Sequence, residues 1–398
     1  MPFIYQPHPD IIRLLTERAL SLSDLQSATR VSLPKLRRVV QELTASGWIR
    51  AVGQSAGTGH RPATLFGLND HSHLIVGVHL QLPGMRLVTV DLTGAVLDEA
   101  GLQSDDLLMP NDALREITHY VRHVQTEYPD RQVIGVGVAT PGFVDSANGE
   151  LLMIERVPTW HTLPIRSRLE SSLDLPITLV NDIDAVAIAE LRYADSRSSD
   201  DLLYLGFYSG IKASMFLNGR LYKGPFGNAG ILGRTAISEE GDARLEDVAS
   251  LHAVCAQFDT RMDHDLEQHR AVRQITGRRA RFQKILEMAD VGDPLCAEII
   301  GAMMSKLALS VSNLLCLIQP SVLIMGGALS TMPERLFDQL ERRIRRPLTP
   351  LISNRLVIQQ ARLTAPNSVA VGAAHQFLLE YINTDQFLQQ MAHIDKTA

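Results

Sequence analysis

The sequence predicts an α+β multidomain protein in which a small helical module precedes a larger α/β body. The chain has 398 residues, which is more than one hydrophobic core usually holds. Apolar side chains follow a helical spacing in the first 70 residues, whereas strand-like runs alternate with helical segments beyond them. Apolar residues make up 45% and charged residues 21%, which excludes disorder, collagen and coiled coil as the main architecture.

The charge is divided unevenly between these two parts. The whole chain has a formal net charge of -6, but residues 1–70 hold eight Lys and Arg against five Asp and Glu, so this segment is +3 and the rest is -9. Within residues 30–61 there are six basic side chains and one acid, Glu42. A basic N-terminal module on an acidic body is typical of a DNA-binding domain joined to a ligand-sensing domain. A solvated basic helix face explains the charge equally well, so the residue pattern has to decide.

The apolar spacing in the basic module predicts three helices followed by a glycine-rich β-hairpin. A first helix is expected over residues 9–20, and Ser23 is expected to cap a short second helix. The third helix is expected from residue 33 to 43, with Ser32 as its N-cap. Three helices and a hairpin within about 65 residues form a winged helix-turn-helix domain, which we place at residues 1–70.

The third helix of such a domain enters the major groove of double-stranded DNA. Burial of its apolar face leaves the polar side chains outward. The predicted DNA contacts are Ser32, Lys35, Arg37, Arg38 and Gln41, with Arg61 reaching a phosphate or a narrow minor groove from the wing. A small helical module that docks on a protein partner is the alternative.

Beyond residue 70, strands and helices alternate as in an α/β body of two lobes with a cleft between them. The expected strands cover 74–80, 87–92, 133–139, 177–180, 202–207, 213–217 and 322–325, and the expected helices 111–128, 184–194, 244–258 and 295–318. The basic stretch 264–284 is expected to be a solvent-facing helical insertion. Residues 307–329 are apolar, but polar interruptions favour a buried helix and then a buried strand over a membrane span, so no membrane partner is expected.

The cysteine content and the N-terminus both favour the reducing cytoplasm. Cys255, Cys296 and Cys316 are too few and too dispersed for a disulfide framework, and they form no C-x-x-C pair. The first ten residues contain three prolines and no apolar run after a basic region, so no signal peptide is expected.

Several motifs in the body resemble the ROK family, which comprises bacterial sugar kinases and sugar-responsive transcriptional repressors, and the resemblance covers nearly the whole chain. Residues 136–145 are similar to the family's strand and Pro-Gly loop, which includes Gly142. Asn181 and Asp182 are similar to its sugar-binding Asn-Asp turn, although an Asx turn that caps the following helix is the alternative. Further similar segments are 219–224, 227–230, 325–327 and 371–374.

This resemblance implies an actin-like, ribonuclease-H-like body of two lobes with a sugar in the cleft. The first lobe is expected at residues 71–195 together with a C-terminal helix at 375–398, and the second lobe at 196–374.

Both phosphate loops of the family's kinases are altered in this chain. The first loop has the form Asp-x-Gly-Gly-Thr in the family, but residues 79–83 read HLQLP, and the second, Gly-Ile-Gly-Ala-Gly, is matched by GIKAS at 210–214. Glycine lets backbone N–H groups approach phosphate, so its loss argues against phosphoryl transfer. We therefore expect no catalytic residue, no cofactor and no enzyme activity, although Asp182 matches the family's general base. A sugar kinase with an altered nucleotide site is the alternative.

The family signature Ala-Gly-Glu-x-Gly-His reads AGILGR at residues 229–234, so Ile231 replaces a sugar-contacting Glu and Arg234 replaces a His. In most members this His and three cysteines hold a structural zinc, so the resemblance implies that the metal is missing here. Glu246 matches a further sugar-binding Glu. Arg234 shifts the expected site toward an anionic effector such as a sugar phosphate or sugar acid, while an internal pair with Asp182 or Glu246 is the alternative.

Together these features predict a cytoplasmic, sugar-responsive transcriptional regulator that represses a carbohydrate-utilisation operon. Asn181, Asp182, Glu246, Arg234 and Gly142 are expected to hold a sugar or sugar-derivative effector. The other partners are double-stranded operator DNA and further copies of the chain, because a palindromic operator requires a homodimer or homotetramer.

Overall fold

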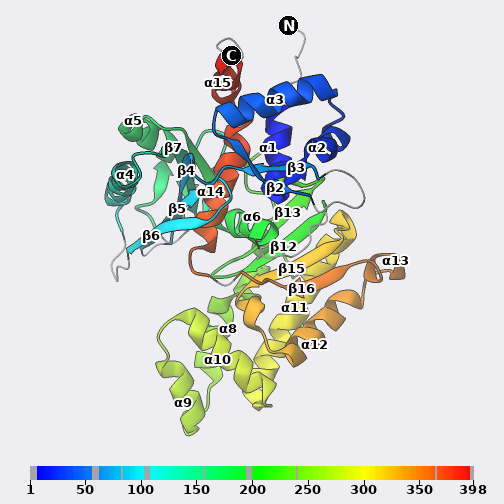
Figure 1. Cartoon of the computed structure of the whole chain (residues 1–398). Helices are drawn as coiled ribbons and strands as arrows, with labels where there is room; N and C mark the ends of the chain where they lie inside the picture. Colours follow the sequence, from blue (N-terminus) through cyan, green and yellow to red (C-terminus); the bar gives the residue numbers. More distant parts are fainter. Residues whose placement is uncertain are drawn as a thin grey trace. The chain divides into compact units, whose positions relative to one another are not determined.

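The computed structural model describes residues 7–55, 62–81, 84–102, 108–155, 157–193, 200–238, 241–363 and 365–394. The chain divides into two compact units (Figure 1). The first runs to Arg192 and resumes at Ala365, and the second extends from Tyr193 to Thr364.

The first unit begins with three helices and a small antiparallel sheet of order β1-β3-β2. The helices are α1 (His8–Glu17), α2 (Leu22–Thr29) and α3 (Leu33–Ala45), and the strands are β1 (Leu20–Ser21), β2 (Ile49–Gln54) and β3 (Thr64–Leu68). Apolar side chains from all three helices, including Ile11, Leu25 and Leu36, are buried. The order of elements therefore follows the predicted order of three helices and a hairpin.

Two details of this region differ from the prediction. Helix α1 ends at Glu17 because Leu20 and Ser21 pair with strand β3. The expected cap at Ser23 is wrong, since Ser21 caps α2. The Ser21 hydroxyl accepts the backbone N–H of Asp24 at 3.2 Å, and the Asp24 carboxylate accepts the backbone N–H of Ser21 at 3.0 Å. This reciprocal pair is a capping box.

A five-stranded sheet of order β11-β7-β4-β5-β6 forms the centre of the first unit. Strands β4, β7 and β11 are parallel, while β5 and β6 are antiparallel to their neighbours. The strands are β4 (His73–Leu80), β5 (Met85–Asp91), β6 (Val96–Leu102), β7 (Gln132–Thr140) and β11 (Ile177–Asn181), and a smaller sheet contains β8 (Phe143–Asp145), β9 (Glu150–Met153) and β10 (His161–Leu163).

Helices cover both faces of the five-stranded sheet (Figure 1). Helices α4 (Pro110–Glu127) and α5 (Ile165–Leu173) pack on one face, and α6 (Asp182–Tyr193) and α14 (Ser368–Tyr381) pack on the other. Helix α14 approaches the strands closely, because a Cβ at Gly77 would lie 2.1 Å from the Ala370 oxygen and one at Gly137 would lie 2.0 Å from the Ala373 oxygen. A second C-terminal helix, α15 (Asp385–Ile394), follows α14.

The second unit contains another five-stranded sheet, of order β14-β13-β12-β15-β16, and helices packed on it. Its strands are β12 (Leu202–Phe207), β13 (Ile211–Leu217), β14 (Arg220–Leu221), β15 (Val322–Gly327) and β16 (Val357–Gln360). Its α-helices are α7 (Leu245–Ala249), α8 (Leu251–Arg261), α9 (Glu267–Gln274), α10 (Arg278–Asp290), α11 (Pro294–Ile318), α12 (Glu334–Arg345) and α13 (Pro350–Ser353), and two 3-10 turns are η1 (Leu232–Arg234) and η2 (Ala328–Thr331).

Two predicted helical segments of this unit need correction. The helix expected over residues 244–258 is broken at Ser250, whose hydroxyl accepts the N–H of Ala253 at 3.2 Å and so begins α8. The basic stretch 264–284 is more than a solvent-facing insertion. Helices α9 and α10 turn most of their Arg and Lys residues outward but bury Val272 and Phe282 in the core of the unit.

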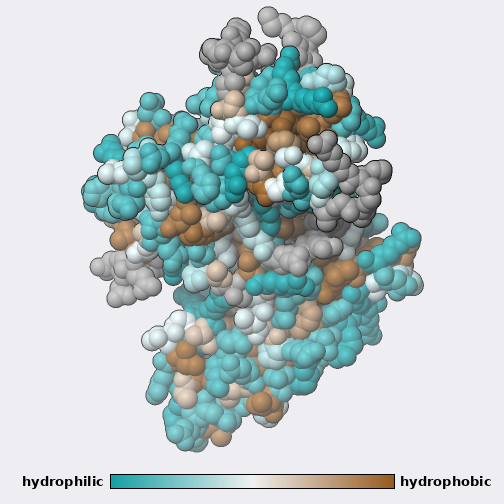
Figure 2. Space-filling view, in the orientation of Figure 1, coloured by the Kyte–Doolittle hydropathy of each residue, from teal (hydrophilic) through white to brown (hydrophobic). Residues whose placement is uncertain are grey.

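Helix α11 is long and apolar enough to cross a membrane by length and composition. Along its length, however, Ile299, Met303, Leu307 and Val311 are buried in the core of the second unit. Strand β15, which follows it, is buried throughout. A buried helix followed by a buried strand is thus confirmed, and the surface of this unit is mostly hydrophilic on the face shown in Figure 2.

Candidate functional site

The Asn-Asp turn lies where two parallel strands of the first unit end. Asn181 is the last residue of β11 and is paired with Thr140 at the end of β7, while Asp182 is the first residue of α6. The carboxyl ends of neighbouring parallel strands are the usual place for a ligand in an α/β sheet. The local sequence therefore presents an amide and a carboxylate at the edge where ligand contacts are expected.

Hydrogen bonds connect this turn to the Pro-Gly loop. The Asn181 side chain, 6% exposed, donates from Nδ2 to the backbone oxygen of Gly142 at 3.1 Å. The backbone N–H of Ile183 lies 3.0 Å from Asn181 Oδ1 and 2.9 Å from Asp182 Oδ1. Gly142 has a φ of +88°, and a Cβ there would lie 2.3 Å from the Met153 oxygen. The Asx turn is thus present, and Gly142, Asn181 and Asp182 are brought together in one loop cluster.

The second unit holds the other two predicted effector contacts as an ion pair. Arg234 Nε, at the end of η1, lies 2.9 Å from Glu246 Oε1 on α7, and the two side chains are 29% and 23% exposed. The carboxylate lies close to Gly233, where a Cβ would come within 2.8 Å of Glu246 Oε2. The internal pair that the sequence left open therefore forms. A site shared by all five predicted residues stays a prediction.

The outward side of α3 carries most of the predicted DNA contacts. Ser32, Arg37, Arg38 and Gln41 are exposed, and Lys35 is half-buried. Hydrophilic residues gather along α3 at the top of the view in Figure 2. Ser32 is the N-cap residue of α3 but makes no side-chain capping bond. Arg61 lies outside the described residues.

The sequence does not predict a buried carboxylate on the inner face of α3. Glu42 is 7% exposed, lies 2.7 Å from His8 Nε2 on α1 and 3.2 Å from Arg38 Nε. Burial lowers the pKa of His8 below its usual value, against the opposing effect of its hydrogen bond to Glu42. The i,i+4 spacing of Arg38 and Glu42 was the available signal. The pair joins the predicted DNA-contacting face to helix α1.

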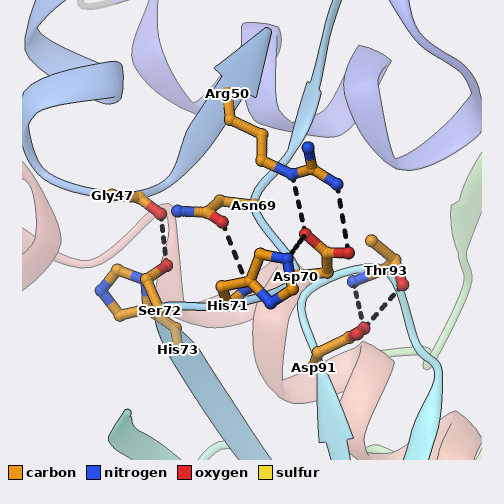
Figure 3. A network of polar contacts seen from close by, with 9 residues as sticks. All are labelled: Gly47, Arg50, Asn69, Asp70, His71, Ser72, His73, Asp91 and Thr93. Atoms are coloured by element: carbon orange, nitrogen blue, oxygen red, sulfur yellow. Dashed lines mark hydrogen bonds and ion pairs between the residues drawn. The ribbon is translucent and has the colours of Figure 1, made fainter. Parts of the chain in front are cut away.

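A polar network lies where the N-terminal helices join the sheet of the first unit (Figure 3). Arg50 donates to both oxygens of Asp70, from Nε at 2.7 Å and from Nη2 at 3.2 Å. The Ser72 hydroxyl donates to the Gly47 oxygen and lies 2.8 Å from Nδ1 of His73. Burial lowers the pKa of His73 to about 4. The connection between α3 and β4 is therefore held by side-chain bonds as well as by the backbone.

No group of three or more His, Cys, Asp or Glu side chains within the described residues is arranged to hold a metal ion.

Comparison with known proteins identifies the family. The profile of the ROK family matches residues 84–378. This chain belongs to the ROK family. The mixed α/β body of ROK proteins is thus confirmed as its fold. A ROK family transcriptional regulator described as a homolog of the E. coli MLC protein has a similar solved structure, with a TM-score of 0.79 at 20% identity over 97% of this chain and 98% of that chain. The ROK hexokinase from Thermus thermophilus has a TM-score of 0.64 at 22% identity over 78% of this chain and 100% of that one.

Curated relatives of this ROK protein include regulators and a kinase. It is 22% identical over 340 residues to the xylose repressor of Caldicellulosiruptor bescii, covering 82% of this chain and 84% of the relative. It is 21% identical over 337 residues to the DNA-binding transcriptional dual regulator NagC of Escherichia coli, covering 81% and 80%. It is 25% identical over 285 residues to the glucokinase of Thermotoga maritima, covering 66% and 88%.

Proposed function

We propose that this ROK protein is a sugar-responsive, DNA-binding transcriptional repressor of a carbohydrate-utilisation operon, with a body that binds the effector without catalysis. The observation that supports it best is a helix α3 with an exposed basic face ahead of a ROK body. The similar regulator structure covers 97% of this chain, whereas the hexokinase covers 78%. This difference in coverage supports the proposal that the N-terminal helices are a DNA-binding domain added to the ROK body.

For the DNA-binding step, we assign residues 1–70 to a winged helix-turn-helix domain with α3 as the recognition helix. Arg37 and Arg38 would contact phosphates and base edges in the major groove, with Gln41 on the same outward side. Arg61 is assigned to the wing. Two α3 helices from a homodimer or homotetramer would read the two halves of a palindromic operator. Size-exclusion chromatography with light scattering measures the oligomeric state of the full-length protein.

For the effector, we assign Asn181, Asp182 and Gly142 of the first unit together with Glu246 and Arg234 of the second. The amide of Asn181 can donate and accept hydrogen bonds, whereas the carboxylates of Asp182 and Glu246 accept them from sugar hydroxyls. The ion pair with Glu246 compensates the charge of Arg234, so the main reason for expecting an anionic effector is weakened. We therefore favour a neutral sugar over a sugar phosphate or sugar acid.

The DNA-binding assignment is tested by selecting duplexes from a random pool with the full-length protein and measuring retardation of the selected duplex. The double variant Arg37→Glu, Arg38→Glu should bind at least tenfold more weakly and lower the slope of log K against log salt concentration by about 2. Arg115→Glu is a single charge-reversal control, because this arginine is exposed on α4, which lies apart from α3 in Figure 1. Unchanged binding by the double variant would contradict the assignment.

The effector assignment is tested by adding D-xylose, D-glucose, N-acetyl-D-glucosamine or glucose 6-phosphate to the complex with the selected duplex. One neutral sugar should release the DNA, and Asp182→Asn should weaken that release. If calorimetry shows that glucose 6-phosphate binds more tightly than the neutral sugars, the effector is anionic. A coupled assay of ATP consumption with the same sugars tests for kinase activity. If the wild type consumes ATP and Asp182→Asn does not, the protein is a sugar kinase and the proposed function is wrong.

A further inference from the structure

Trp48 connects the recognition helix to three other elements of the first unit. It follows the end of α3 and precedes β2, and its side chain is completely buried. Its ring stacks on His73 of β4 with centroids 4.8 Å apart and on Tyr381 of α14 at 6.1 Å, and it meets Phe387 of α15 edge-on at 5.0 Å. Aromatic contacts of this kind are specific in geometry as well as stabilising.

The backbone around Trp48 allows little independent movement. Its N–H donates to the Leu43 oxygen in α3 at 2.9 Å, and its own oxygen accepts the N–H of Asn69 at 3.0 Å. The Ser46 hydroxyl at the end of α3 lies 3.7 Å from the sulfur of Met391 on α15. The network of Figure 3 ties the same segment to β4. A shift of α14 and α15 must therefore move the end of α3 or break the aromatic contacts.

The other part of α14 packs against the helix that begins at Asp182. A Cβ at Gly372 would lie 1.8 Å from the backbone oxygen of Ala185 and 3.2 Å from the Cβ of Ala189, both on α6. Ala185 lies within the first turn of α6 after Asp182. Because this contact is backbone against backbone, no side-chain rotation can absorb a displacement of α6. Helix α14 thus contacts α6 near the predicted effector turn and contacts Trp48 near the recognition helix.

We propose that Trp48 is a positioning residue, through which α14 couples the Asn181–Asp182 turn to the orientation of α3. This inference rests on the proposed function. A sugar that favours one position of α6 would shift α14, and the Trp48 contacts would pass the shift to the recognition helix. Coupling of this kind is measured as the factor by which the sugar changes the affinity for DNA.

The first test removes the aromatic connection. Trp48→Ala should bind D-xylose, D-glucose and N-acetyl-D-glucosamine with the same affinities as the wild type. The sugar that releases the selected duplex from the wild type should, however, change the affinity of Trp48→Ala for that duplex less than twofold. Trp48→Phe should restore most of the coupling, because it keeps the ring, and the indole N–H has no hydrogen-bond partner among the described residues. A coupling factor in Trp48→Ala equal to that of the wild type would overturn the inference.

The second test disturbs the contact between α6 and α14. Gly372→Ala adds a methyl group where no space exists and should change both the DNA affinity and the coupling factor at least threefold. Gly301→Ala is the matched control, since it also adds a methyl group to a helical glycine, but nothing lies within 4 Å of the new atom. Should Gly372→Ala fail to fold, Ala189→Gly loosens the same contact and should lower the coupling factor. Unchanged coupling in the folded variant would refute the inference.

The fluorescence of Trp48 gives a readout that a merely structural role would not change. The chain has two tryptophans, so the difference between wild-type and Trp48→Phe spectra isolates the signal of Trp48. The releasing sugar should shift this signal, and the three sugars should rank as they do in DNA release. An unshifted signal during sugar-induced release would refute this inference alone. If no duplex is selected, or if no sugar releases it, the proposed function fails and this inference fails with it.

Discussion

The free energy of unfolding of the first unit should decrease as the pH falls from about 6.5 to about 4. The contribution of His73 to this decrease can be calculated from its pKa. Burial lowers the pKa of His73 from 6.5 to about 4, against a weaker opposing effect of the Gly47 backbone. In this window the unfolded chain takes up a proton that the folded chain does not, so lower pH favours unfolding. Each tenfold change in proton affinity corresponds to about 1.4 kcal/mol, so His73 alone accounts for about 3 kcal/mol.

The assay is urea unfolding at a series of pH values between 4.5 and 8, followed by tryptophan fluorescence. The wild-type slope combines several groups, because burial also lowers the pKa of His79 to about 4 and that of His375 to about 3. His73→Asn isolates one contribution, since the Asn amide can keep the hydrogen bond to Ser72 without titrating. Near pH 5, the slope of the unfolding free energy against pH should be smaller in this variant than in the wild type, by about 1 kcal/mol per pH unit.

Loss of the stacking on Trp48 lowers the stability of His73→Asn at every pH, so the difference in slope is the decisive quantity. Equal slopes for the two proteins would show that His73 titrates normally in the folded state. A wild-type stability that rises as the pH falls from 6.5 to 4.5 would refute the reasoning for all three histidines.

Three further changes test local features of the fold. Gly142→Ala should destabilise the first unit by about 2 kcal/mol in thermal unfolding, because its φ of +88° and the nearby Met153 oxygen both disfavour a methyl group, and an unchanged midpoint would contradict this. Removing the Ser21 hydroxyl with Ser21→Ala should cost about 1 kcal/mol while Ser23→Ala costs almost nothing, and the reverse order would disprove the observed cap. In a double-mutant cycle of Arg234→Gln and Glu246→Gln, the coupling energy should be about 1 kcal/mol or less, since both side chains are partly exposed; a value above about 3 kcal/mol would contradict it.

The strands that the sequence predicts best are those buried along nearly their whole length. The apolar runs at 74–80 and 202–207 correspond to β4 and β12 within a residue, because burial leaves a continuous apolar signal. Strand β6 was missed, since most of its side chains are exposed and it alternates weakly. The choice between Ser21 and Ser23 as a cap depends on β1 pairing with β3, a contact more than 40 residues away in the chain.

The candidate site shows the same division between local and distant information. The position of Asn181 and Asp182 after a strand follows from the neighbouring residues alone. The hydrogen bond from Asn181 to Gly142 joins residues 39 positions apart, so no local pattern reveals it. Glu42 was counted as one acid among six bases, but its burial between His8 and Arg38 depends on how α1 packs against α3. The aromatic contacts of Trp48 likewise involve both ends of the chain.

Under the proposed function, the charge and the packing of the N-terminal module should affect different parts of DNA recognition. Lys and Arg side chains attract phosphates whatever the base sequence, and this attraction tolerates small movements of the helix. Hydrogen bonds to base edges need a fixed helix. Both regions that hold α3 contain buried side chains, with Glu42 on its inner face bonded to His8 of α1 and Trp48 just beyond its last turn. A displacement of α3 should therefore reduce the preference for the operator before it reduces affinity for DNA in general, which is the change that a repressor needs in order to release its site.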